Sequence, residues 1–163
     1  MMRKASLFFI GGLIWALSTS SSLAAGEQWS VTHDPQSRSD GSQICQMRYG
    51  IRLPLMAITA AKGAQLLAVA ASDLDAVETP RVQGAMRFSS GRSFALQFSV
   101  NKSGRAGANA VARISGSDIG SVMARIAMGG TMTLEVGNSV EIVFPIDGAA
   151  GESRAFMRCR DAL

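Results

Sequence analysis

The chain has 163 residues, of which 47% are hydrophobic, and a formal net charge of +4. Its basic residues are scattered, and only Arg154, Arg158 and Arg160 lie close together, so the charge argues against a nucleic-acid partner. The sequence contains no internal repeat and no low-complexity tract.

The first 24 residues have the features of a cleavable secretory signal peptide. Arg3 and Lys4 give a positive start, and residues 5–17 form an apolar run that is short for a membrane-spanning helix. The small residues Ser22 and Ala24 predict cleavage after Ala24, with cleavage after Ala25 as the next alternative. No cysteine directly follows the cleavage site and no pair of arginines precedes the apolar run, which argues against a lipoprotein and against export in the folded state. An uncleaved membrane anchor is the alternative.

Cleavage after residue 24 leaves residues 25–163, a length typical of one domain with its own hydrophobic core. Arg3 and Lys4 leave with the signal peptide, so 14 basic residues remain against 12 acidic ones. We expect a periplasmic or secreted protein without an integral membrane segment after cleavage.

Most of this domain alternates apolar and polar residues with the period of two that is typical of β-strands. In residues 93–101, Phe94, Leu96, Phe98 and Val100 would all point to one face of a strand. Further strands are expected at residues 29–32, 43–49, 65–71 and 81–88.

A β-hairpin is predicted from residues 131–136 and 140–144, which both alternate. Gly137 and Asn138 lie between them, and both residue types tolerate the positive φ angles of tight hairpin turns.

A mobile loop is predicted over residues 101–109, which are rich in Gly and Ser. Lys102 and Arg105 give this loop two cationic side chains for contacts with a partner.

One helix is predicted over residues 117–128, where apolar residues recur at helical spacing. Ser117 can cap its N-terminus, Asp118 suits the positive end of the helix dipole, and Gly129 supplies the stop.

A second helix is predicted over residues 147–160, with Asp147 as its cap. It would place Phe156 and Cys159 against the sheet. Because strands dominate, we expect a mainly β fold, either an antiparallel β-sandwich or a curved sheet, with one or two short covering helices.

The two cysteines, Cys45 and Cys159, lie near the two ends of the exported domain. In an oxidising compartment they are expected to form one disulfide that ties the C-terminal segment to the first strands. A redox pair or a metal site is the alternative, but the CxxC spacing is absent and His33 is the only histidine.

Motifs for phosphate binding, serine hydrolases, zinc proteases and calcium loops are absent from the sequence. His33 beside Asp34 is interpreted as a surface pair rather than as part of a catalytic triad. Asp73, Asp75 and Glu78 are interpreted as a solvated stretch, with weak cation binding as the alternative. We therefore expect no enzyme, and no catalytic, cofactor-binding or metal-binding residues.

A family resemblance rests on three segments. These are residues 29–33 (Trp-Ser-Val-Thr-His), residues 45–47 (Cys-Gln-Met) and residues 146–149 (Ile-Asp-Gly-Ala) after the hairpin. Together they resemble the invasion-associated locus B family of exported alphaproteobacterial proteins, although His33 stands where that family has its first cysteine. The resemblance implies a periplasmic or surface protein linked to host-cell invasion or envelope function, with no catalytic residues.

The leading hypothesis is an exported, non-catalytic protein that acts through protein contacts in the cell envelope or at a host surface. The alternative is an inhibitor of a periplasmic or host enzyme, such as lysozyme or a protease, that uses the loop at residues 101–109. An enzyme is the third hypothesis.

Overall fold

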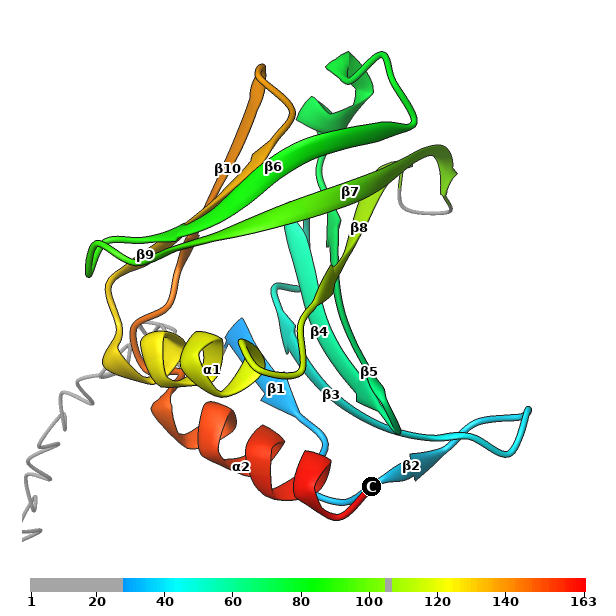
Figure 1. The fold of residues 1–163 in the computed structure, drawn as a ribbon, viewed down its shortest axis with the longest axis vertical. Coiled ribbons are helices and arrows are strands. Elements are labelled where there is room, and N and C mark those ends of the chain that lie inside the picture. Colours follow the sequence, from blue (N-terminus) through cyan, green and yellow to red (C-terminus); the bar gives the residue numbers. More distant parts are fainter. Residues whose placement is uncertain (1–27, 105–106) are drawn as a thin grey trace, which may run out of the picture.

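The strands of the described residues form one antiparallel sheet (Figure 1). The computed structural model describes residues 28–104 and 107–163. The predicted signal peptide, residues 1–24, lies outside this part of the chain. Neighbouring strands follow the order β1-β3-β4-β5-β8-β7-β6-β9-β10, and β2 pairs with β3 beside this path.

The first strands are β1 (Trp29–Val31), β2 (Gln36–Ser37), β3 (Gln43–Tyr49), β4 (Leu55–Ala61) and β5 (Ala64–Ala70). A 3₁₀ helix, η2 (Ser72–Ala76), precedes β6 (Arg81–Phe88), β7 (Ser93–Gly104) and β8 (Gly107–Ile114). Helix α1 (Ile119–Met128), the hairpin β9 (Thr131–Val136) and β10 (Val140–Pro145), and helix α2 (Ala150–Asp161) complete the chain.

The sheet curls into a half-barrel that brings its two ends together. Phe144 of β10 contacts Tyr49 of β3 edge-on, with ring centroids 5.4 Å apart, and Trp29 of β1 contacts Tyr49 at 5.0 Å. The curl encloses one hydrophobic core, because the inward side chains of both halves meet there. Its largest fully buried side chains include Met47, Ile58, Leu67, Phe98, Phe144 and Phe156.

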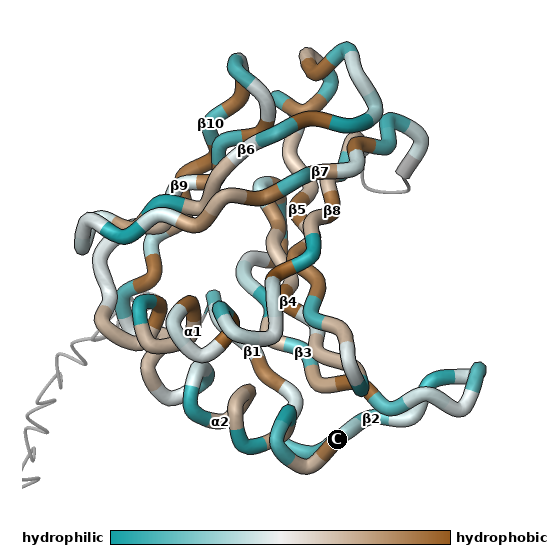
Figure 2. Tube along the Cα trace, in the orientation of Figure 1, coloured by the Kyte–Doolittle hydropathy of each residue, from teal (hydrophilic) through white to brown (hydrophobic). Residues whose placement is uncertain are grey.

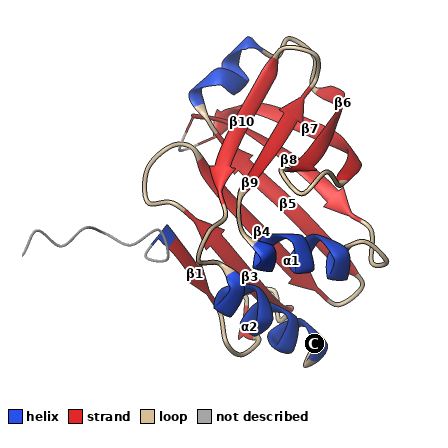
Figure 3. Cartoon of the chain, turned by 90° about the vertical axis from the view of Figure 1, so that its left-hand side faces the viewer, coloured by secondary structure: helices blue, strands red, loops and turns tan. Residues whose placement is uncertain are grey.

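The two helices lie side by side at one end of this half-barrel (Figure 3). Helix α2 packs on β1 and β3, while α1 packs on α2. Inside this layer the buried hydroxyl of Ser153 donates a hydrogen bond of 2.8 Å to the carbonyl oxygen of Met123. The predicted mainly β fold is confirmed, in its curved-sheet form with two covering helices.

The strongly alternating strands are predicted best. β3, β6 and β9 have the expected bounds, β1 and β10 differ from expectation by one residue at one end, and β5 is shifted by one residue at both ends. Strands β2, β4 and β8 are not predicted from the sequence.

The prediction of a mobile loop over residues 101–109 is wrong for the part that the structure describes. Strand β7 continues to Gly104, β8 starts at Gly107, and Asn101 pairs with Asn109 across the two strands. Glycine and serine composition misled the prediction, since these residues lie in a hairpin whose backbone groups pair with one another. Arg105 lies outside the described residues.

Both predicted helix caps are wrong. α1 begins at Ile119, and the Ser117 hydroxyl hydrogen-bonds to the Ser115 hydroxyl at 2.8 Å instead of capping the helix. α2 begins at Ala150, and the Asp147 carboxylate instead accepts a 2.7 Å hydrogen bond from the backbone N–H of Gly130. The predicted stop at Gly129 is confirmed, because it is the C-cap of α1 with φ of 79°.

The β9–β10 hairpin exists, but only one of its two predicted turn residues has positive φ. Gly137 has φ of 66°, whereas no residue other than glycine has positive φ in the described part of the chain, so the prediction for Asn138 is wrong.

Replacing Gly137 with Val should therefore destabilise the protein. A β-branched side chain at this φ costs on the order of 1 to 2 kcal/mol, which lowers the melting temperature by several degrees in a thermal unfolding experiment. The matched Asn138→Ala variant should melt like the wild type. Equal melting of all three proteins would contradict the assigned turn.

Candidate interaction surface

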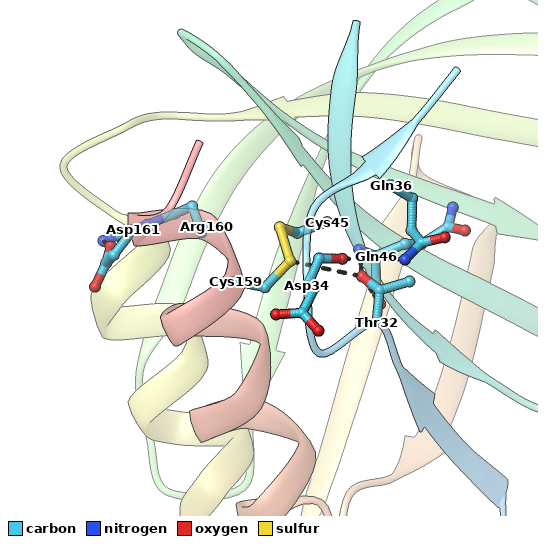
Figure 4. Close-up of a disulfide and its surroundings, with 8 residues drawn as sticks. All are labelled: Thr32, Asp34, Gln36, Cys45, Gln46, Cys159, Arg160 and Asp161. Atoms are coloured by element: carbon cyan, nitrogen blue, oxygen red, sulfur yellow. Dashed lines mark hydrogen bonds and ion pairs between the residues drawn. A yellow bond between two sulfur atoms is a disulfide. The ribbon is translucent and has the colours of Figure 1, made fainter. Parts of the chain in front are cut away.

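The disulfide between Cys45 and Cys159 is present as expected and joins β3 to α2 (Figure 4). The two Cα atoms are 5.8 Å apart, and both cysteines are buried. Beside it, the Thr32 hydroxyl lies 3.8 Å from the Cys159 sulfur and accepts a 2.7 Å hydrogen bond from the backbone N–H of Gln46. The bond thus fixes the C-terminal helix on the sheet.

The polar residues considered for chemistry do not come together. His33 and Asp34 are exposed after β1, whereas Asp73 and Asp75 are exposed on η2. No group of three His, Cys, Asp or Glu side chains placed to hold a metal ion occurs within residues 28–104 and 107–163. The Lys102 ammonium, expected to contact a partner, donates a 2.9 Å hydrogen bond to the Asp75 carbonyl oxygen.

The sheet has a different candidate site, because β4 and β5 are apolar on both faces. Their inward residues, such as Ile58 and Leu67, are fully buried in the core. Figure 2 shows brown and tan stretches along these strands. Alternation puts the remaining side chains on the opposite side of the sheet, away from α2. We call the apolar members of this side the apolar outer face; they are Leu55, Ala57, Ala61, Ala64, Leu66, Ala68, Ala70 and Val111. Thr59 lies among them, and its hydroxyl accepts a 3.0 Å hydrogen bond from the Gln46 side chain.

Strand register places these side chains next to one another. Ala57 pairs with Ala68, which pairs in turn with Val111 of β8. Leu55 pairs with Ala70 at one side of this row, and Leu66 lies at the other side. Most members are only half-buried, and 41% of Leu66 is exposed. Among the described residues, no helix or strand covers this face.

A groove of about 370 Å³ opens at the end of this face where β3 joins β4. Its lining includes Leu55, Ala57, Ala68 and Ala70 from the apolar outer face, together with Tyr49. Burial raises the pKa of the Tyr49 phenol above its usual value, so the group stays protonated at neutral pH. The lining is therefore mainly apolar and uncharged, apart from Arg48.

The β3–β4 loop adds two protruding apolar side chains beside the groove. Ile51, which lines the groove, is 92% exposed, and Leu53 is 46% exposed. Gly50 allows the turn, since its φ is 84° and a Cβ there would lie 3.1 Å from the Pro54 carbonyl oxygen. Large exposed apolar groups beside an apolar groove are typical of interaction surfaces.

The charged residues on β3, β4, β5 and β8 and on the β3–β4 and β4–β5 loops are all positive. These are Arg48, Arg52, Lys62 and Arg113, and all four are exposed. Residues 43–71 contain no acidic residue, and neither do residues 79–117. Asp73 and Asp75 follow β5 on η2, but η2 packs toward β7, β8 and β10.

A second groove of about 370 Å³ lies between α1 and α2. Met123, Ala124 and Met157 line it together with Arg154 and Arg158, two members of the C-terminal basic cluster. The third, Arg160, forms an ion pair with Asp161. Helix α2 also carries Glu152 and Asp161, but neither lines this groove.

None of the described helices is both long and apolar enough to span a membrane. Comparison with family models, with curated proteins and with solved structures finds no match for the chain. The assignment of a function thus rests on the residues themselves.

The apolar outer face is not among the features predicted from the sequence. Residues 55–61 (Leu-Met-Ala-Ile-Thr-Ala-Ala) carry the signal, because they form a nearly continuous apolar run with a lysine and a glycine after it. Such runs are typical of strands that are apolar on both faces.

Proposed function

We propose that the chain is an exported, non-catalytic protein that acts through protein contacts in the cell envelope or at a host surface. The observation that carries this proposal is the apolar outer face with its groove. Its alanines and leucines on β4 and β5, with Val111 of β8, adjoin one another, so their removal from water by a partner lowers the free energy.

Export is supported by two independent features. The sequence starts with the pattern of a signal peptide, and the buried Cys45–Cys159 disulfide is typical of proteins that fold in an oxidising compartment. We propose a periplasmic or secreted location on these grounds. The resemblance to the invasion-associated locus B family agrees with this proposal and adds host contact as the setting to test.

Export can be checked directly. When the gene is expressed from its own signal sequence in a bacterium, the protein should fractionate with the periplasm or the medium. Mass spectrometry should find Ala25 or Gly26 at its N-terminus, because signal peptidase selects small residues before the cut. Recovery of the intact Met1 form in the inner membrane would contradict the proposal.

The contact surface can be mapped with a photo-crosslinking amino acid. Benzoylphenylalanine in place of Leu66 should give a discrete crosslinked product in cells, because position 66 lies in the middle of the apolar outer face and is exposed. The matched control is Ala95 of β7, an exposed position that points outward from another part of the same sheet. Equal products at both positions, or none at position 66, would count against the proposed surface.

The inhibitor hypothesis depended on a mobile loop at residues 101–109. Those of its residues that the structure describes belong to the β7–β8 hairpin, and Lys102 is bound to the Asp75 carbonyl oxygen. No specific observation favours an inhibitory role for this hairpin over a contact role for the apolar outer face.

A further inference from the structure

We propose that the partner of the apolar outer face is an acidic amphipathic helix of another protein. Its apolar side would lie on the alanines of β4 and β5, and its carboxylates would meet the surrounding arginines. This inference rests on the proposed function, because it specifies the partner of the same surface.

In the described part of the chain, the outer side of β4 and β5 lacks a covering layer. Strands that are apolar on both faces are typical of parallel sheets, which helices cover on both sides, and they are unusual in an antiparallel sheet with one open side. Here α2 covers part of the inner side, against β3, and the apolar outer face has no covering element among the described residues (Figure 1). A helix from outside would complete the arrangement that the composition of β4 and β5 favours.

The shape of the apolar outer face suits a helix. Ala57, Ala68 and Ala70 form a low floor, because a methyl group rises little above the pleated sheet. Leu55 and Leu66 border this floor on its two sides along the strands. From Ala64 to Ala70 the face extends about 20 Å, which about 13 residues of helix would span. Small residues let a helix backbone approach closely, as they do between packed helices.

The charge around the apolar outer face favours an acidic partner. Arg48 pairs through the register with Ala57, and Arg113 pairs with Leu66, so both cations stand beside the floor. The ion pairs found among the described residues join Arg87 to Glu135 and Arg160 to Asp161, which leaves Arg48 and Arg113 without a carboxylate partner. A partner with carboxylates would be attracted to this rim and oriented by it.

The same charges disfavour a second copy of the chain, because a symmetric face-to-face dimer would bring equal cations together. A lipid surface fits less well than a helix, because Ile51 is the one large side chain at this face that is almost fully exposed, whereas the alanines are half-buried between strands. Both occupants are outcomes of the following experiment.

The probe is an 18-residue synthetic helix with leucine and alanine on one side and glutamate on its flanks. Its control has lysine at every glutamate position. Binding of each labelled peptide to the protein purified after export is measured by fluorescence anisotropy. We expect the glutamate peptide to bind at least tenfold more tightly than the lysine peptide at low salt. The difference should shrink in 0.5 M salt, where charges on the surface are screened.

Variants of the protein locate the binding. Ala68→Glu should weaken binding of the glutamate peptide at least tenfold, because it puts a like charge on the alanine floor. Arg48→Glu combined with Arg113→Glu should reverse the preference between the peptides. The matched controls are Ala95→Glu, on another part of the sheet, and Arg154→Glu, on α2. Both should bind like the wild type, and circular dichroism should show that all variants are folded.

Equal binding of the two peptides, or a preference that survives the double arginine reversal, would overturn the acidic helix. Binding to phosphatidylglycerol vesicles that Ala68→Glu abolishes, without peptide binding, would assign the face to lipid instead. Dimerisation in light scattering that Ala68→Glu abolishes would assign it to a second copy. If position 66 crosslinks to a protein in cells while neither peptide binds, the contact function stands and the acidic chemistry of the partner is wrong.

Discussion

A Gly84→Ala variant should be severely destabilised, although the change adds a single methyl group. Gly84 lies in the middle of β6, opposite Leu96 of β7 and Val136 of β9. A Cβ at this position would lie 2.0 Å from the Glu135 carbonyl oxygen and 2.8 Å from Cε2 of the buried Phe98. The Glu135 carbonyl belongs to the backbone of a paired strand and the Phe98 ring lies in the core. Neither group can therefore move away without a large cost in free energy.

Overpacking a core typically costs about 1 to 3 kcal/mol, and a clash with a carbonyl oxygen belongs at the upper end of that range or above it. We expect the melting temperature to fall by on the order of 10 °C, measured by circular dichroism. Gly120→Ala in α1 is the matched control, because its Cβ would come no closer than 4.0 Å to Met157. That change should leave stability equal or raise it by up to about 1 kcal/mol. Similar melting of both variants would mean that β6 and β9 do not approach as described.

The elements that could be predicted from the sequence are those with a strong contrast between apolar and polar positions. In β7, large inward residues such as Phe94 and Phe98 alternate with polar ones, so its core is evident. β8 was missed because its inward residues are mainly small. Ala108, Ala110 and Ala112 give no such contrast, and alanine also favours helices.

The candidate surface was missed for a related reason. In β4, the outward Ala57 and the inward Ile58 are both apolar, so the period of two disappears where both faces of the sheet are apolar. The order of the strands also depends on contacts between distant residues, such as the pairing of β5 with β8, which local patterns do not contain. The disulfide was predicted because it needs only two cysteines and an oxidising compartment.

Removing that disulfide should have the largest effect on stability. Cys45 and Cys159 are separated by 114 positions, so the bond closes a long loop in the unfolded chain. In the chain-entropy model such a bond stabilises the folded state by about 5 kcal/mol. A domain of this size has a total free energy of unfolding of roughly 5 to 15 kcal/mol, so the double variant Cys45→Ala, Cys159→Ala should be marginally stable.

We expect this variant to melt on the order of 15 °C below the wild type in thermal unfolding, and to accumulate poorly after export. Both cysteines are almost fully buried, so single replacements would also leave an unpaired thiol, and the double variant is the cleaner measurement. Alkylation of the denatured wild type serves as the control for the bond itself: it should label no thiol before reduction and both thiols after it. The contrary outcome is that alkylation shows the bond intact in the wild type while the double variant still melts within about 3 °C of the wild type. In that case loop closure is not what stabilises this fold. Packing of α2 on β3 must then hold the C-terminal helix in place without the disulfide.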